Sequence, residues 1–321
     1  MLHAPSLNGT IATCLTAGQG QGPRPKGRAQ REALRPSRPS CTMITPFGSI
    51  GRENDMPITH NTALCKLRDG GLALGFGVHH LRSTATPMLA KAAGYDWLFI
   101  DTEHGAHTIQ EATQLCLAAL PTGVAPIVRV CRDALDEGTR ALDNGALGIV
   151  VPHVDTAEHA QRIAAAFRFP PLGHRSWGGP PAIYGFQPPP VAQAQEEINR
   201  EILVCAMLET PQAIDNADAI AAVDGIDSLM IGTSDLSAEM GISGQIGHER
   251  IQVAYGKLAE ACRRHGKFMG MGGVYDEQWA SRYIAMGARL ALGGSDHAML
   301  LAAASARLKF LRSVEPKVKR D

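Results

Sequence analysis

The chain lacks an excess of charge of either sign, because its 321 residues include 31 Lys or Arg and 31 Asp or Glu. Proteins that bind nucleic acid or anionic membranes usually carry a basic field, so the balance argues against both partners. Long hydrophobic runs are also missing: the longest are strand-sized, whereas a membrane span needs about 20 apolar residues. These absences favour small molecules as the chain's ligands.

Disulfide-forming cysteine patterns are absent as well. The seven cysteines contain no CxxC pair and form no even framework, which predicts reduced thiols in a cytoplasmic enzyme. They are Cys14, Cys41, Cys65, Cys116, Cys131, Cys205 and Cys262.

The first 55 residues differ from the rest of the chain. Between Met1 and Gly51 there are six Lys or Arg against one acid, Glu32, among many Pro, Gly, Ser and Thr. Such a segment can bury little apolar surface, so residues 1–55 are predicted to be a disordered basic leader. A mitochondrial targeting peptide is the alternative, but four prolines interrupt the amphipathic helix that it would need. The folded domain is predicted to span residues 56–321.

Beyond residue 60, short apolar runs alternate with amphipathic helical stretches. Near-continuous apolar strands are buried on both faces, and short connections to helices indicate parallel order. Eight such units in about 250 residues predict an α/β fold of the (β/α)8 TIM-barrel type. An open doubly wound sheet would also alternate, but its glycine-rich phosphate turn is missing. The predicted strands are 72–78, 96–101, 125–131, 147–154, 203–208, 227–232, 267–274 and 289–294.

Ionisable residues gather where the predicted strands end. Five successive strands carry one there, at the face where such barrels build their active sites. These residues are Asp101, Glu103, His104, Arg129, His153, Glu209 and Asp235.

Glu209 and Asp235 lie about one β/α repeat apart, so they are expected at equivalent heights on neighbouring strands. Two carboxylates with open positions beside them suit a hard divalent cation such as Mg²⁺ or Mn²⁺. Helix capping is the alternative role, because "ETPQA" and "SDLSA" both resemble helix starts. As a pair near Arg129, they favour the metal site.

Two further residues keep open interpretations. Arg129 interrupts the core-like run "PIVRV", so it either pairs with a structural carboxylate or meets an anionic substrate. Asp143, in "RALDNGALG", is either a surface residue or an acid that orients a histidine.

Several ordered motifs make the chain resemble the HpcH/HpaI aldolases, the class II pyruvate aldolases of the phosphoenolpyruvate barrel superfamily. The resemblance covers about residues 60–310 and rests on "DWLFIDTEHG", "PIVRV", "ALDNGALGIVVPHVDTAEHA", "RSWGG", "MLETPQAIDN", "LMIGTSDLSAEMG" and "GARLALGGSDHAML". It implies a carbon–carbon lyase that acts on 4-hydroxy-2-oxo acids with Mg²⁺, Mn²⁺ or Co²⁺. It also implies a homotrimer or homohexamer, with the last helix exchanged between subunits.

The resemblance assigns roles to single positions. The metal ligands fall on Glu209 and Asp235, and the arginine that steadies the keto oxygen falls on Arg129. The catalytic histidine falls on His104, with Asp143 as the aspartate that pairs with it. Substrate-carboxylate binding falls on the backbone amides of the "GTSD" turn, at Gly232, Thr233 and Ser234.

Two departures from the family pattern bear on the reaction. Met207 stands where many bacterial members have a glutamine, and His153 stands where they have an apolar residue. A histidine there is shared with macrophomate synthase, a fungal relative that decarboxylates oxaloacetate and adds the enolate to a second molecule. His153 is therefore predicted to bind the second substrate, with a core or rim histidine as the alternative.

Other mechanisms are weighed against this one. A Schiff base needs a lysine near the site, but the chain has eight lysines and the one near a strand, Lys267, lies at the wrong end. A CoA-ester lyase of the citrate lyase β type would need a basic nucleotide site, and none is evident. A barrel that only binds anions would have no use for a base at His104.

Overall fold

The computed structural model describes residues 57–315. The predicted basic leader lies outside these residues.

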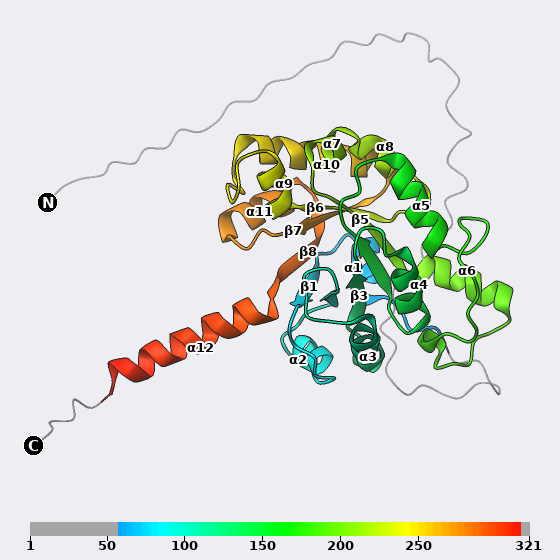
Figure 1. Ribbon diagram of the computed structural model, residues 1–321, viewed down its shortest axis with the longest axis horizontal. Helices are drawn as coiled ribbons and strands as arrows, with labels where there is room; N and C mark the ends of the chain where they lie inside the picture. Colours follow the sequence, from blue (N-terminus) through cyan, green and yellow to red (C-terminus); the bar gives the residue numbers. More distant parts are fainter. Residues whose placement is uncertain (1–56, 316–321) are drawn as a thin grey trace, which may run out of the picture. The chain divides into compact units, whose positions relative to one another are not determined.

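Eight parallel strands close into a barrel and follow each other around it in chain order (Figure 1). The predicted TIM barrel is therefore confirmed. The strands are β1 (Ala73–Val78), β2 (Trp97–Asp101), β3 (Ala125–Arg129), β4 (Gly148–Val151), β5 (Leu203–Leu208), β6 (Ser228–Gly232), β7 (Phe268–Gly272) and β8 (Ala288–Ser295).

Helices connect the strands and cover the outside of the barrel (Figure 1). Several begin at threonines whose hydroxyl accepts a backbone N–H of the first turn, as Thr108, Thr156 and Thr210 do. Such caps fix where each helix starts, and hence the length of the loop at the strand's carboxyl end. The α-helices are α1 (Thr62–Arg68), α2 (Thr86–Ala92), α3 (Ile109–Ala119), α4 (Leu135–Asp143), α5 (Ala157–Phe167), α6 (Val191–Glu201), α7 (Pro211–Asp215), α8 (Ala217–Ala221), α9 (Thr233–Glu239), α10 (Glu249–His265), α11 (Glu277–Met286) and α12 (Asp296–Ser313).

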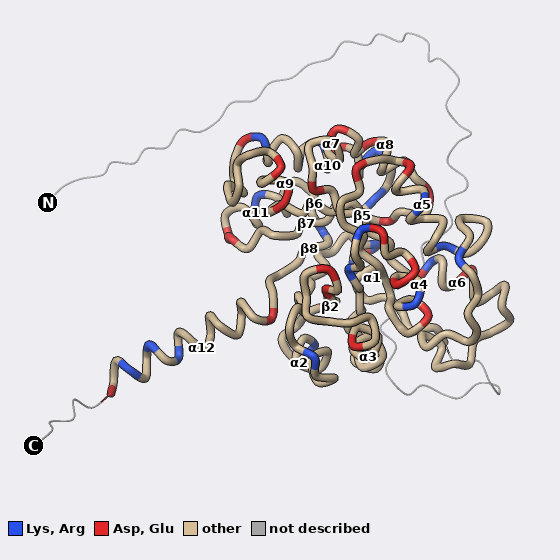
Figure 2. Tube along the Cα trace, viewed as in Figure 1, with Lys and Arg blue, Asp and Glu red and all other residues tan. Residues whose placement is uncertain are grey.

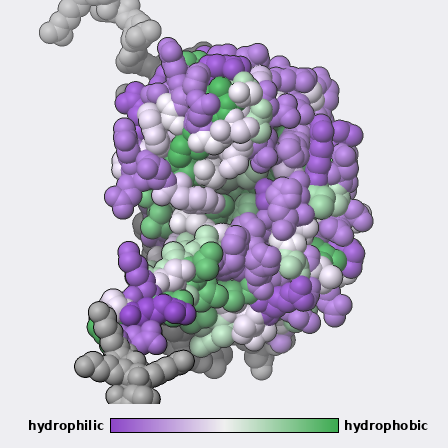
Figure 3. Space-filling view, turned by 60° about the vertical axis from the view of Figure 1, so that its left-hand side comes forward, coloured by the Kyte–Doolittle hydropathy of each residue, from purple (hydrophilic) through white to green (hydrophobic). Residues whose placement is uncertain are grey.

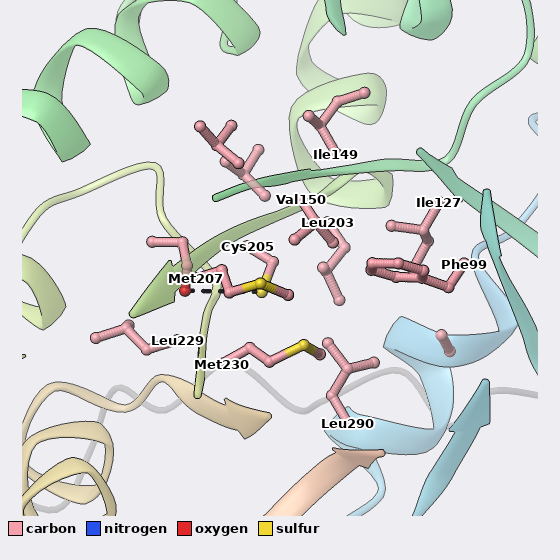
Figure 4. Packing of buried hydrophobic residues seen from close by; sticks show 14 of the residues in the cluster. Phe99, Ile127, Ile149, Val150, Leu203, Cys205, Met207, Leu229, Met230 and Leu290 are labelled. Atoms are coloured by element: carbon pink, nitrogen blue, oxygen red, sulfur yellow. Dashed lines mark hydrogen bonds between the residues drawn. The ribbon is translucent and has the colours of Figure 1, made fainter. Parts of the chain in front are cut away.

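Large apolar side chains fill the interior of the barrel. Figure 4 shows Phe99, Ile127, Met207, Met230 and Leu290 among them, and all five are buried. Met207 of β5 and Met230 of β6 are register partners. A filled barrel is a packed core and not a channel, so polar chemistry is confined to the ends of the strands.

Helix α12 differs from the other helices because almost its whole surface is exposed. It extends away from the barrel in Figure 1, and Figure 2 shows its basic residues near its C-terminal end. Its large exposed apolar side chains are Leu300, Leu301, Leu308, Phe310 and Leu311. Apolar surface is visible in the lower half of the space-filling view (Figure 3). No helix among the described residues is long and apolar enough to cross a membrane.

Candidate active site

The centre of the site is an ion pair between the last residues of β2 and β3. Asp101 and Arg129 are register partners in the parallel sheet. The Arg129 Nε lies 2.9 Å from Oδ1 of Asp101, and Nη2 lies 2.6 Å from Oδ2. This two-point contact lets both charges remain buried, since each satisfies the other's hydrogen-bonding groups.

Asp101 also organises the loop that follows β2. Its Oδ1 accepts the backbone N–H groups of Glu103 and His104, and His79 Nε2 lies 3.2 Å from Oδ2. A side chain at Gly105 would overlap the carbonyl oxygen of Asp101, so the tight turn requires glycine. Burial alone would raise the pKa of Asp101, but the hydrogen bonds from His79 and Arg129 hold it well below the usual range.

Glu103 lies on the open side of Arg129. Its Oε2 is 3.2 Å from Nη1 of Arg129 and 3.8 Å from Nε2 of His104. Its other oxygen is 4.0 Å from Nε2 of His153. The His104 ring is mostly exposed, with 64% of its side-chain surface open to solvent. The base predicted from the sequence therefore stands at the mouth, where a substrate can reach it.

Glu209 follows the last residue of β5 and is buried, with 1% of its surface exposed. Its Oε2 accepts the backbone N–H of His153 at 2.8 Å and lies 3.3 Å from that residue's Nδ1. A side chain at Gly232 would overlap the Glu209 carboxylate, so glycine leaves room for it at the end of β6.

Burial is the main reason that the pKa of Glu209 is raised to about 7. The negative charge of Asp235 adds to the rise, while the contacts with His153 and the charge of Arg129 oppose it. Asp235 lies in the first turn of α9, with an exposed side chain. The two predicted metal ligands therefore repel each other in the structure.

This donor set fits a divalent cation. A buried carboxylate with a raised pKa is held without full compensation of its charge, and a second carboxylate acts on it from the first turn of α9. A cation bound to both would remove the repulsion, and carboxylate oxygens suit Mg²⁺ or Mn²⁺.

The predicted carboxylate-binding turn begins at the end of β6. The Thr233 hydroxyl is 2.8 Å from the Tyr255 hydroxyl and therefore points into the core. Ser234 is exposed, and a Cβ at Gly273 would lie 2.9 Å from its Oγ. Ser234 is thus the residue of the turn that is open to solvent, and its predicted role in binding a carboxylate stays a prediction.

Asp143, the last residue of α4, contacts a residue that sequence reasoning did not single out. Its Oδ1 lies 2.7 Å from Nη2 of Arg175, which is buried and stacks on Phe169. Arg175 opens the motif "RSWGG", so the motif was a signal, but a partner for its arginine could not be assigned from sequence. The predicted pairing of Asp143 with His104 stays a prediction.

His153 occupies a constrained position after β4. Its φ is 51°, in the left-handed region that few side chains adopt, and this turn aims its backbone N–H at Glu209. The ring lies between Glu209 and Glu103. The structure therefore places His153 in the acidic part of the mouth.

The chain is similar to known proteins over most of its folded part. Residues 80–303 match the HpcH/HpaI aldolase/citrate lyase family. The chain is 37% identical to the 4-hydroxy-4-methyl-2-oxoglutarate aldolase tasA of Hapsidospora irregularis, over 68% of this chain and 84% of that protein. It is 34% identical to the 2-keto-3-deoxy-L-rhamnonate aldolase of Salmonella gallinarum, over 78% of this chain and 92% of that protein.

Solved structures agree with these matches. An HpcH/HpaI aldolase from Desulfitobacterium hafniense has a TM-score of 0.74 at 30% identity, covering 79% of this chain and 97% of that one. Macrophomate synthase has a TM-score of 0.64 at 26% identity, covering 80% and 96%.

Proposed function

The chain belongs to the HpcH/HpaI aldolase/citrate lyase family, and we propose that it is a carbon–carbon lyase that uses a divalent cation to cleave or form 4-hydroxy-2-oxo acids. The observation that carries this proposal is the convergence of Glu209 and Arg129 at one end of the barrel. One is a buried carboxylate whose charge calls for a cation, and the other is a fixed guanidinium beside it. Cleavage of each such acid between C3 and C4 releases pyruvate as its enolate.

Glu209 and Asp235 would hold the cation. A divalent cation there would polarise the carboxylate and keto oxygens of a bound 2-oxo acid. Mg²⁺, Mn²⁺ and Co²⁺ all fit this donor set, and the choice among them is left to experiment.

Arg129 stabilises the negative charge that develops on the keto oxygen. Asp101 holds the guanidinium at two nitrogens, so Arg129 does not need to reorganise when that charge appears. The backbone amides from Gly232 to Ser234 would receive the substrate carboxylate. Together they keep the reacting carbon in one orientation.

His104 moves the proton. In the cleavage direction it takes the proton of the C4 hydroxyl, the C3–C4 bond breaks, and the electron pair enters the enolate of pyruvate. The backbone N–H of His104 donates to Oδ1 of Asp101, and its ring Nε2 lies 3.8 Å from Oε2 of Glu103. Asp143 is proposed to orient this ring, as the family pattern implies.

A second activity, decarboxylation of oxaloacetate followed by addition of the enolate to another molecule, is favoured by His153. Its partly exposed ring lies between Glu103 and Glu209, where it could contact a second molecule. Loss of CO₂ produces the same enolate as aldol cleavage, so the same Arg129 would serve both reactions.

The test is a pyruvate-release assay on the purified chain. Substrates would include 4-hydroxy-4-methyl-2-oxoglutarate, which yields two pyruvates on cleavage, 2-keto-3-deoxy-L-rhamnonate and oxaloacetate. EDTA should abolish release, and Mg²⁺, Mn²⁺ or Co²⁺ should restore it. Borohydride with pyruvate should leave no adduct; a pyruvate trapped on a lysine would overturn the metal mechanism.

We propose that the active form is a homo-oligomer, a trimer or hexamer, in which a second copy covers the apolar residues of α12. The support is the exposure of Leu300, Leu301 and Phe310 on a helix of 18 residues. Light scattering on the whole chain and on Leu300→Lys would test it, because the variant should dissociate. A cytoplasmic location is proposed, with a mitochondrial one as the alternative, and fractionation would separate them.

A further inference from the structure

A second group of candidate ligands lies where β1 and α12 meet, outside the Glu209–Asp235 pair. It comprises His79, which follows β1, and Asp296 and His297, the first residues of α12. One ligand atom from each residue lies within 4.8 Å of the other two. Barrel closure brings these positions together although they are more than 200 residues apart in sequence.

The tautomer of His79 is set by Asp101. The carboxylate of Asp101 is buried and can only accept, so the nitrogen that lies 3.2 Å from it, Nε2, carries the proton. In the neutral imidazole this leaves a lone pair on Nδ1. That atom is buried and has no hydrogen-bond partner among the described residues. A carboxylate that holds one imidazole nitrogen while the other is free is the arrangement typical of metal-binding histidines.

Asp296 is fixed as an ionised carboxylate. Its Oδ2 accepts the backbone N–H groups of residues 79, 80 and 81, and its Oδ1 accepts that of His297 at 2.7 Å. Burial would raise its pKa, but these hydrogen bonds lower it. Oδ1 also lies 3.3 Å from Nδ1 of His297, close enough for a cation to bind both atoms in place of a shared proton.

The surrounding charges favour a cation over an anion. Asp101 is already paired with Arg129, whereas Asp296 has a single side-chain ion partner in the described part of the chain, His297. Two imidazole nitrogens and one carboxylate suit Zn²⁺ and other late first-row divalent metals, unlike the all-oxygen pair Glu209 and Asp235.

We propose that His79, Asp296 and His297 bind a late first-row divalent metal ion such as Zn²⁺, at a site distinct from the catalytic one. A metal ion there joins the end of β1 to the first turn of α12. It also holds the proton of His79 on Nε2, where it supports Asp101. The proposal does not depend on the proposed catalytic role of Glu209.

The experiment uses the full chain, stripped with a chelator and then saturated with Mg²⁺ to fill the all-oxygen site. Co²⁺ is titrated and followed by its visible d–d absorption, and Zn²⁺ is titrated by calorimetry. One equivalent of each per chain should bind despite the excess of Mg²⁺, and Zn²⁺ should raise the melting temperature. The same equivalent should bind to Glu209→Gln, which separates this site from the catalytic one.

His297→Ala is the decisive variant, because that side chain is half-exposed and its loss should leave the fold intact. It should weaken Zn²⁺ binding by at least about 10–100-fold, the loss that removal of a partner of a metal ligand already causes. His80→Ala is the matched control: its ring lies 5.0 Å from that of His297, but it is outside the ligand set. Absence of binding above Mg²⁺, unchanged affinity in His297→Ala, or equal loss in His80→Ala would each overturn the proposal.

Discussion

Two regions of the barrel mouth each bury a carboxylate at the end of a strand, yet their chemistry is opposite. At the end of β2, Asp101 is gripped by Arg129 and His79, and its pKa lies well below the usual range although burial opposes this. At the end of β5, Glu209 is almost equally buried, but its pKa is raised to about 7.

Burial imposes the same kind of cost on both carboxylates, and the neighbours decide the outcome. A guanidinium bound at two points offsets the cost for Asp101, whereas Glu209 faces an imidazole and a second carboxylate. In the first region, the guanidinium of Arg129 neutralises the charge of Asp101. The second region has no such guanidinium bound to its carboxylate, and the pKa of Glu209 is raised to about 7, as expected for the metal site proposed there.

The largest expected effect concerns the loop that Asp101 holds. His104→Ala should lower the turnover of aldol cleavage by about 10²–10⁴-fold, the usual contribution of a general base. Decarboxylation of oxaloacetate should fall much less, because loss of CO₂ needs no proton removed from a hydroxyl. Both rates are measured on one preparation, with the exposed His60→Ala as control. Equal losses in both reactions, with Mg²⁺ affinity intact, would refute His104 as the base.

The second prediction concerns the buried ion pair between Asp101 and Arg129. Asp101→Asn leaves Arg129 buried without its main counter-charge, which should cost about 3–5 kcal/mol of unfolding free energy. The control is Asp215→Asn, which removes an exposed pair with Lys257 and should cost about 0–1 kcal/mol. Urea unfolding of both variants measures the difference. Similar values would mean that Asp101 is not the structural partner that the geometry indicates.

Much of this arrangement could be predicted from sequence because each strand corresponds to a short local run of apolar residues. Apolar runs gave all eight strands, and the rule that barrels place chemistry at the carboxyl ends brought Asp101, Arg129 and Glu209 to one rim. Strand ends were less certain. β4 ends at Val151 and not at 154, because the chain turns at His153 with a positive φ to deliver its N–H to Glu209.

Long-range partners were not predictable in the same way. Asp143 meets Arg175 of the loop between α5 and α6, and His79 and Asp296 meet through barrel closure. Such contacts depend on loop geometry in three dimensions, which hydrophobic periodicity does not encode. The residues at the carboxyl ends of the strands were thus predictable. That Arg129 pairs with Asp101 and not with Glu209 was not.

The third prediction concerns Glu209 in the metal-free protein. Its pKa is about 7 when folded and 4.5 in the reference state, so the folded form binds the proton more tightly. The resulting stability is present below about pH 4.5 and is lost as pH rises through 7. Glu209→Gln should therefore stabilise the metal-free chain by about 1–3 kcal/mol near pH 8 and by little near pH 5. Urea unfolding in EDTA at both pH values measures this; a pH-independent difference would contradict it.

The smallest expected effect is on Mg²⁺ affinity when His153, one neighbour of Glu209, is changed. His153→Asn keeps a residue that tolerates the left-handed backbone, so the N–H donated to Glu209 at 2.8 Å is retained and only the ring is lost. That ring favours the ionised carboxylate, so its removal should raise the pKa of Glu209 further. Because a metal ligand must be deprotonated, Mg²⁺ affinity should fall modestly near pH 6 and stay unchanged near pH 8.5. Calorimetric titration at both pH values measures this, with His80→Ala as control. A loss of the same size at both pH values would mean that His153 acts on the metal site by shape and not by charge.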